Sequence, residues 1–112
     1  MLVDSGGYAE GVSYLERARA ANPGSWGVYF YLGKANLRLR HDGAAVQLLR
    51  RAADLNPGEP AVFYLLGSAL RAEGENKAAQ SAFARLAELH ASQLDAEARA
   101  LHNSLVFKYS DK

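Results

Sequence analysis

Hydrophobic positions along this chain recur with the spacing of helices, in stretches that are rich in alanine, leucine and arginine and poor in β-branched residues. Such stretches favour helix over strand. Proline and glycine lie between them, where a missing N–H group and a fixed φ angle begin or end helices. The pattern therefore predicts helices over residues 8–22, 25–39, 42–55, 60–72, 76–90 and 94–106.

The same pattern returns after 34 residues, since the pair Leu32-Gly33 recurs as Leu66-Gly67. A period of this size marks an array of stacked units, in which each unit buries its apolar face against its neighbours. Glycine within a helix costs up to about 1 kcal/mol relative to alanine. Two glycines at equivalent places therefore predict a close helix–helix contact that a Cβ atom would obstruct.

Composition and charge exclude several classes of partner. The 13 basic and 12 acidic residues leave a net charge of +1, which gives no general attraction to nucleic acid or to an anionic membrane. The basic clusters, residues 38–41 and Arg50-Arg51, are too small for the basic stripe of a nucleic-acid-binding domain. No apolar run approaches the roughly 20 residues that a membrane span needs. We therefore expect a soluble protein that binds neither nucleic acid nor a membrane.

Motifs for chemistry are missing from the sequence. The absence of cysteine removes disulfides and thiol chemistry, and it fits the cytoplasm and the periplasm equally. None of His41, His90 and His102 has a second histidine or a cysteine three or four residues away, so no zinc-ligand spacing exists. No Gly-x-Ser-x-Gly motif or phosphate-binding glycine loop occurs. The sequence predicts no enzyme activity, no catalytic or metal-binding residues and no cofactor.

At its signature positions the repeated pattern resembles the tetratricopeptide repeat. The matches in residues 26–59 are Tyr29, Leu32, Gly33, Ala45, Leu49, Ala52 and Pro57. The matches in residues 60–93 are Phe63, Leu66, Gly67, Gly74, Ala79 and Phe83. The resemblance implies an all-α fold, a right-handed superhelix of antiparallel helix pairs with a C-terminal capping helix. A generic helical bundle is the structural alternative, but it would not need phased Leu-Gly pairs.

The resemblance divides the chain within one domain, residues 1–112. Residues 1–25 are a partial repeat that supplies its second helix, 26–59 and 60–93 are full repeats, 94–107 are the capping helix and 108–112 are a frayed tail. The sequence also departs from the family pattern. The departures are Gly11 and Leu86 in place of alanines, Asn36 in place of an aromatic residue and Ala91 in place of a proline.

The expected capping helix lacks the Leu-Gly pair. Ser92 and Asp95 form a capping pair ahead of it. Its apolar stripe consists of Leu94, Ala98, Leu101 and Leu105. We expect this stripe to pack back on the array while the polar face meets water, as terminal caps of repeat proteins do.

The N-terminal end of the array carries half a repeat, so we expect Met1 to begin an excised piece of a longer protein. The face of helix 8–22 that a preceding helix would cover is then open. We hypothesise that the chain self-associates through this face, which includes Tyr8, Val12 and Leu15. A bacterial source is favoured by the alanine- and arginine-rich composition.

In tetratricopeptide arrays the first helix of each repeat lines a concave face, which implies a groove for a protein or peptide ligand. The peptide-binding residues so implied are Phe30, Lys34, Leu37, Arg38, Tyr64, Ser68 and Arg71. The periodicity agrees, because these residues share or border a side about 120° away from the Leu-Gly stripe. Aromatic rings supply apolar area and arginines bind carboxylates bidentately, so we expect a ligand that carries a carboxylate.

Other interpretations of these residues stay open. Phe30 and Tyr64 can fill the seam between adjacent first helices, with Lys34 and Arg38 solvated. Members of the family that bind chaperone tails carry a clamp of lysine and asparagine side chains at matching inward positions. This sequence does not reproduce the clamp, so we do not expect chaperone tails as ligands. The alternative functions are a structural or oligomerisation segment, and an accessory that presents substrate to a catalytic domain elsewhere.

Overall fold

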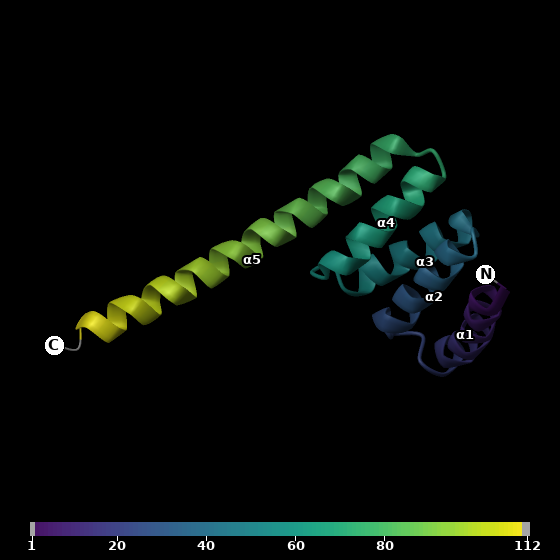
Figure 1. Ribbon diagram of the computed structural model, residues 1–112, viewed down its shortest axis with the longest axis horizontal. Coiled ribbons are helices and arrows are strands. Elements are labelled where there is room, and N and C mark those ends of the chain that lie inside the picture. The colour runs from purple at the N-terminus through teal and green to yellow at the C-terminus, as the bar shows by residue number, and fades with distance from the viewer. Residues whose placement is uncertain (1, 111–112) are drawn as a thin grey trace.

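In the computed structural model, helices account for the whole fold of the part described, which is the backbone of residues 2–110 and the side chains of residues 10–106. The helices are α1 (Leu2–Ala21), α2 (Trp26–Arg38), α3 (Asp42–Leu55), α4 (Pro60–Ala72) and α5 (Asn76–Ser110). Each helix packs against the next one along the chain, and α2 also contacts α4 (Figure 1). The expected all-α array of antiparallel helix pairs is confirmed. The ranges predicted for α2, α3 and α4 agree with the structure to within one residue.

The two helix pairs are closed by the same turn, one period apart. After α2, the N–H of His41 donates to the carbonyl of Asn36 at 2.8 Å. After α4, the N–H of Glu75 donates to the carbonyl of Leu70 at 2.9 Å. Arg40 and Gly74 lie inside these turns with φ angles of 66° and 83°. This is the Schellman ending of a helix, in which a residue in the left-handed region satisfies the last carbonyl groups.

Both Leu-Gly pairs mark a close helix crossing, as the sequence predicted. A Cβ atom added at Gly33 would lie 2.5 Å from Cγ of Leu49, and one added at Gly67 would lie 2.7 Å from Cε1 of Phe83. Leu49 itself is fully buried. Each glycine therefore lets the first helix of a pair rest directly on a large side chain of the second helix, and the core is built around these crossings. The central core cluster is Ala45, Val46, Leu49, Leu66, Ala69, Leu70, Ala79 and Ala82.

A second contact also repeats with the period, this time between arginines and aromatic rings. The guanidinium carbon of Arg51 lies 5.9 Å from the centroid of Tyr29, and that of Arg85 lies 6.0 Å from the centroid of Phe63. At such distances the cation is attracted by the face of the ring. The second helix of each pair thus holds the first aromatic position of the repeat in the same way twice.

Asn36, which departs from the family pattern, is buried with 8% of its surface exposed. Its side-chain amide donates a hydrogen bond of 2.8 Å to the carbonyl of Leu32. Burying an amide costs free energy unless it is hydrogen-bonded. The bond back to its own helix therefore explains how a polar residue is accommodated where the second repeat has Leu70.

Helix α5 contradicts the prediction of a separate capping helix. It runs without a break from Asn76 to Ser110, through the expected turn near residues 91–93. The physical reason is at Ala91, since the preceding repeat has Pro57 at this place, two residues after the end of α3. Alanine continues a helix that proline would end, so Ser92 and Asp95 lie inside α5 and do not cap it. His90, expected near a helix end, also lies within α5.

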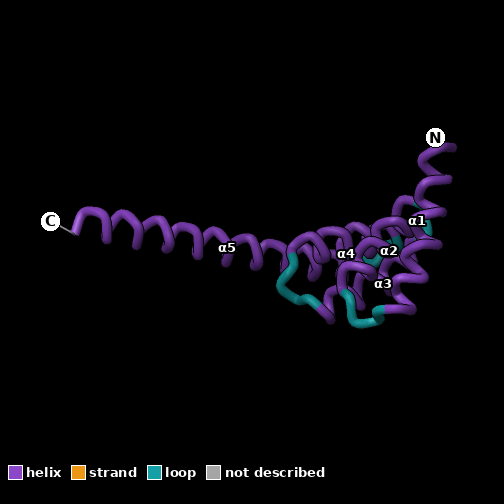
Figure 2. Tube along the Cα trace, turned by 90° about the horizontal axis from the view of Figure 1, so that it is seen from below, coloured by secondary structure: helices purple, strands orange, loops and turns teal. Residues whose placement is uncertain are grey.

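The end of α5 does not pack back on the array either. Every residue from Ala91 to Val106 is exposed, and this part of the helix projects away from the other helices (Figures 1 and 2). We call residues 91–110 the arm and residues 2–90 the body. The expected frayed tail is helical through Ser110, and residues 111–112 lie outside the part described.

At the other end of the chain α1 begins at Leu2, earlier than the predicted residue 8. Gly6 and Gly7 weaken this stretch but leave its backbone hydrogen bonds in place, as proline would not. Helix α1 packs against α2, and Val12 and Leu15 are half-buried. The side chain of Tyr8, which we assigned to the open face, lies outside the described residues.

Candidate binding surface

A shallow hollow of about 340 Å³ lies between the first helices of the two repeats. We call it the basic hollow. Five of the seven predicted ligand-binding residues line it, with four others from α4, the turn after α2 and the start of α3. The lining residues are Lys34, Leu37, Arg38, Arg40, Asp42, Tyr64, Leu65, Ser68 and Ala72.

The charge of this hollow is predominantly positive. Lys34 and Arg38 come from α2, Arg40 from the turn that follows, and Asp42 is the one carboxylate among the lining residues. The ion pairs found among the described residues join Arg19 to Glu16, Arg50 to Glu75 and Arg85 to Glu88. The three cations of the hollow take part in none of these pairs, so their charge is available to an anionic group of a ligand.

Tyr64 gives the hollow an apolar wall with a polar tip. Its side chain is 56% exposed, although its ring lies 6.4 Å from Phe83 in an edge-to-face arrangement that fixes its direction. One turn further along α4, the hydroxyl of Ser68 donates to the carbonyl of Tyr64 at 3.0 Å. Because this bond uses the hydroxyl proton, the oxygen of Ser68 remains free to accept a hydrogen bond from a ligand.

Phe30 and Arg71 do not line the basic hollow. Phe30 is half-buried against the core, with its ring edge-to-face to Trp26 at 5.8 Å and to Tyr31 at 5.1 Å. The guanidinium carbon of Arg71 lies 5.5 Å from the centroid of Phe83 on α5. These two residues are thus engaged in packing between helices, while the other five predicted residues meet around one hollow.

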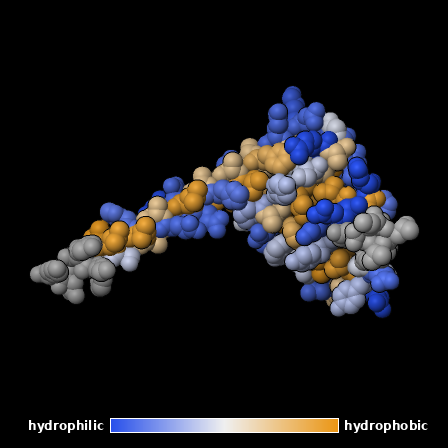
Figure 3. Space-filling model, viewed as in Figure 1, coloured by the Kyte–Doolittle hydropathy of each residue, from blue (hydrophilic) through white to orange (hydrophobic). Residues whose placement is uncertain are grey.

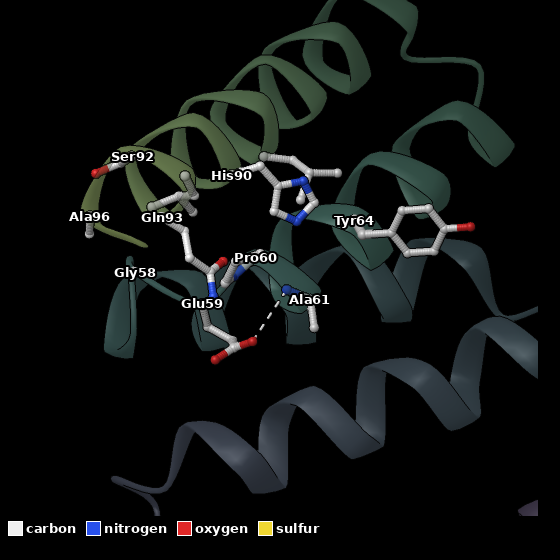
Figure 4. Close-up of a pocket in the computed structure, with 11 residues that line it drawn as sticks. Gly58, Glu59, Pro60, Ala61, Tyr64, His90, Ser92, Gln93 and Ala96 are labelled. Carbon is white, nitrogen blue, oxygen red and sulfur yellow. Dashed lines mark hydrogen bonds between the residues drawn. The ribbon is translucent and has the colours of Figure 1, made fainter. Parts of the chain in front are cut away.

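A larger hollow of about 810 Å³ opens between the start of α4 and the middle of α5 (Figure 4). Tyr64 lines both hollows, so the two adjoin at its ring. The larger hollow has apolar walls from Leu86 and Leu89 and polar groups from His90 and Gln93. The remaining lining residues are Gly58, Glu59, Pro60, Ala61, Ser92 and Ala96.

Sequence reasoning did not select Arg40, Asp42 or the larger hollow. Arg40 could have been found from the period, because it stands 34 residues before Gly74 and so belongs to the same turn. The larger hollow could not, because it exists only where α5 continues past Ala91. Within the described part of the chain, no group of three or more histidine, aspartate or glutamate side chains is arranged to hold a metal ion. Among the same residues, no helix is both long and apolar enough to cross a membrane.

The repeated turn, the paired glycine crossings and the stacked antiparallel helices define a protein built from helix-pair repeats, whose usual work is to bind other proteins. A comparison with protein families agrees, since the model of the tetratricopeptide repeat matches residues 2–60. The chain belongs to the tetratricopeptide repeat family, and it is a protein-interaction repeat module. No match was found among curated proteins.

Solved structures of MamA share the fold. A MamA RS-1 ArsTM double mutant superposes with a TM-score of 0.74 at 28% identity, over 77% of this chain and 48% of its own. MamA 41-end from Desulfovibrio magneticus RS-1 gives a TM-score of 0.73 at 28% identity, over 77% of this chain and 49% of its own. A further crystal structure of MamA gives 0.72 at 26% identity, over 73% and 48%. The chain spans about half the length of these MamA chains.

Proposed function

We propose that the chain binds an acidic segment of a partner protein on the surface formed by α2 and α4, the first helices of its two repeats. The observation that carries this proposal is the basic hollow, where Lys34, Arg38 and Arg40 gather beside the exposed ring of Tyr64 and form no ion pair with any side chain of residues 10–106. A carboxylate in the hollow receives charge-assisted hydrogen bonds, and the ring covers the neighbouring apolar part of the ligand.

The ligand continues along α4 into the larger hollow. Tyr64 lines both hollows, so an extended peptide whose carboxylate lies at Arg38 passes the ring and places its next apolar side chain against Leu86 and Leu89. We therefore expect an acidic residue followed by an apolar one within a few positions. Tyr64 is the central residue of this surface, because it contacts the ligand in both hollows.

The experiment is a selection from a random peptide library, followed by titration of an enriched peptide. The double variant Lys34→Glu/Arg38→Glu is expected to weaken binding at least about 100-fold, because each reversed charge repels the ligand carboxylate. The matched control is Arg17→Glu/Lys77→Glu, which makes the same change of charge on exposed residues of α1 and α5. Equal loss in the two variants would show that net charge, and not the hollow, governs binding.

Arg40→Gly separates binding from folding. The substitution removes one cation of the hollow, and it places glycine in a left-handed turn where the second repeat already has Gly74. Relief of the φ of 66° is expected to stabilise the fold by about 1 kcal/mol, while the affinity for an acidic peptide falls about tenfold. Unchanged affinity in this more stable variant would contradict the role of the basic hollow.

A further inference from the structure

The arm carries an apolar stripe that nothing in the described structure covers. Leu94, Leu101 and Leu105 are 64%, 63% and 46% exposed. Figure 3 shows hydrophobic surface at intervals along the projecting helix. The stripe also includes the exposed Ala91 and Ala98 of the arm and extends to the exposed Ala87 at the end of the body, so its members follow one another at alternating intervals of four and three residues. That spacing places one continuous seam along a helix that pairs with another helix.

The arm cannot cover its stripe by folding as the first helix of another repeat. Aligned on α4 with the 34-residue period, Leu101 takes the place of Gly67 and Glu97 that of Phe63. At Gly67 even a Cβ atom would lie 2.7 Å from the side chain behind it, and Phe63 packs against the core. A leucine and a carboxylate do not fit these two positions, so stacking of the repeats stops at α5.

The stripe nevertheless begins where a next helix would dock. In the first pair of the array, α3 presents Val46, Leu49 and Ala53 to the core that it shares with α4. Ala53 corresponds, 34 residues later, to Ala87 on α5. Ala87 is exposed and is the first residue of the seam. The seam is therefore continuous with the face on which the array places an antiparallel helix.

We propose that the covering helix is the arm of a second copy of this chain, docked antiparallel on α5. The sizes of the side chains are complementary in this arrangement, because the seam is small at its start and large at its end. With Leu94 opposite Ala98, Ala91 lies opposite Leu101 and Ala87 opposite Leu105, in both directions. A two-fold axis relates the copies, so each surface meets itself and the assembly closes as a dimer. A parallel pair would place alanine on alanine and leave gaps.

The charges beside the seam make this dimer reversible. Asp95 and Glu97 lie near the two-fold axis and face their own counterparts in the second copy. Like charges oppose association, while the leucine and alanine seam favours it through burial. The same acidic residues disfavour an anionic lipid surface as the occupant of the stripe.

The test measures self-association of the 112-residue chain by sedimentation over a series of concentrations. We expect a monomer–dimer equilibrium that Leu101→Lys weakens at least about tenfold, because the change places a charge in the seam. Asn103→Lys adds the same charge to the opposite side of the arm and is expected to leave the equilibrium unchanged. Because both residues are exposed, the thermal unfolding of the body serves as the folding control.

Introduced cysteines can show whether the two arms run parallel or antiparallel, since the chain has no cysteine of its own. A mixture of Ala91→Cys and Leu101→Cys is expected to form a mixed disulfide, whereas Ala91→Cys alone stays uncrosslinked because its two copies lie about ten residues of helix apart. Self-crosslinking of Ala91→Cys would indicate a parallel pair and overturn the antiparallel arrangement.

Two outcomes would overturn the proposal as a whole. One is that the chain remains monomeric at every concentration tested. This outcome counts against the dimer also if the arm of the monomer binds zwitterionic vesicles. The other is association that Leu101→Lys leaves intact and Val12→Lys abolishes, which would assign self-association to α1. Glu97→Gln provides a positive control, because removing a repulsive pair at the two-fold axis is expected to strengthen the dimer several-fold.

Discussion

Gly67 sets the distance between α4 and α5 through the ring of Phe83. In Gly67→Ala the added Cβ atom displaces a ring that also contacts Tyr64 and Arg71. Overpacking of this kind costs about 1–3 kcal/mol, which exceeds the roughly 1 kcal/mol that alanine adds to helix stability. We expect a net loss of about 1–2 kcal/mol in the free energy of unfolding, measured by denaturant titration.

Gly11 provides the matched control for Gly67, because it also lies inside a helix but has open space where a Cβ atom would be. Gly11→Ala is expected to raise the stability of α1 by up to about 1 kcal/mol through helix propensity alone. Opposite signs for the two substitutions would attribute the effect at Gly67 to packing. Stabilisation at both positions would show that the crossing has room for a methyl group.

The lining of the basic hollow, our candidate site, was predicted only in part from the sequence. Periodicity assigns a side of the helix to each residue, and that was enough to bring Lys34, Leu37 and Arg38 together with Tyr64 and Ser68. It cannot say where a long or flexible side chain ends. Arg71 starts on the same side but extends to the ring of Phe83, because a guanidinium is attracted to an aromatic face.

At the scale of whole elements, the pattern of proline and glycine predicted three helices to within a residue and failed at the fifth joint, between the predicted helices 76–90 and 94–106. Pro57 and Gly58 lie between α3 and α4, and Pro60 is the first residue of α4; together they prevent a continuous helix. The corresponding stretch of α5 has none of these residues. A capping pair such as Ser92 and Asp95 favours a helix start, but it does not interrupt a helix whose backbone hydrogen bonds can all form.

Ala91→Pro is therefore expected to restore the missing break. Proline removes the hydrogen bond to residue 87 and costs about 3 kcal/mol within a helix. Detached from the body, an arm of this length is a marginal helix. Far-ultraviolet circular dichroism of a dilute sample should show a loss of helix equivalent to at most about 20 residues, with the thermal midpoint of the body unchanged. Ala91→Leu is the control, since leucine preserves the helix.

The whole molecule is extended because α5 continues beyond the other helices of the array. The Cα radius of gyration is 18.3 Å, and the molecule measures 63 × 33 × 29 Å. A compact chain of this length has a radius of gyration of about 13 Å. We expect small-angle X-ray scattering at low protein concentration to give a value near that of the extended form. A value close to the compact one would show that the arm folds back in solution.

Because the arm is exposed, the fraction of its residues that is helical depends on temperature and on whether a partner covers it. A helix that stands alone in water is held together by its own hydrogen bonds, and nucleation and fraying keep short ones near the midpoint of the helix–coil transition. Each turn that a partner covers must then be ordered at the expense of chain entropy. Association through the arm is consequently a folding reaction as well as a docking reaction, and its enthalpy and temperature dependence report how many turns were coil beforehand.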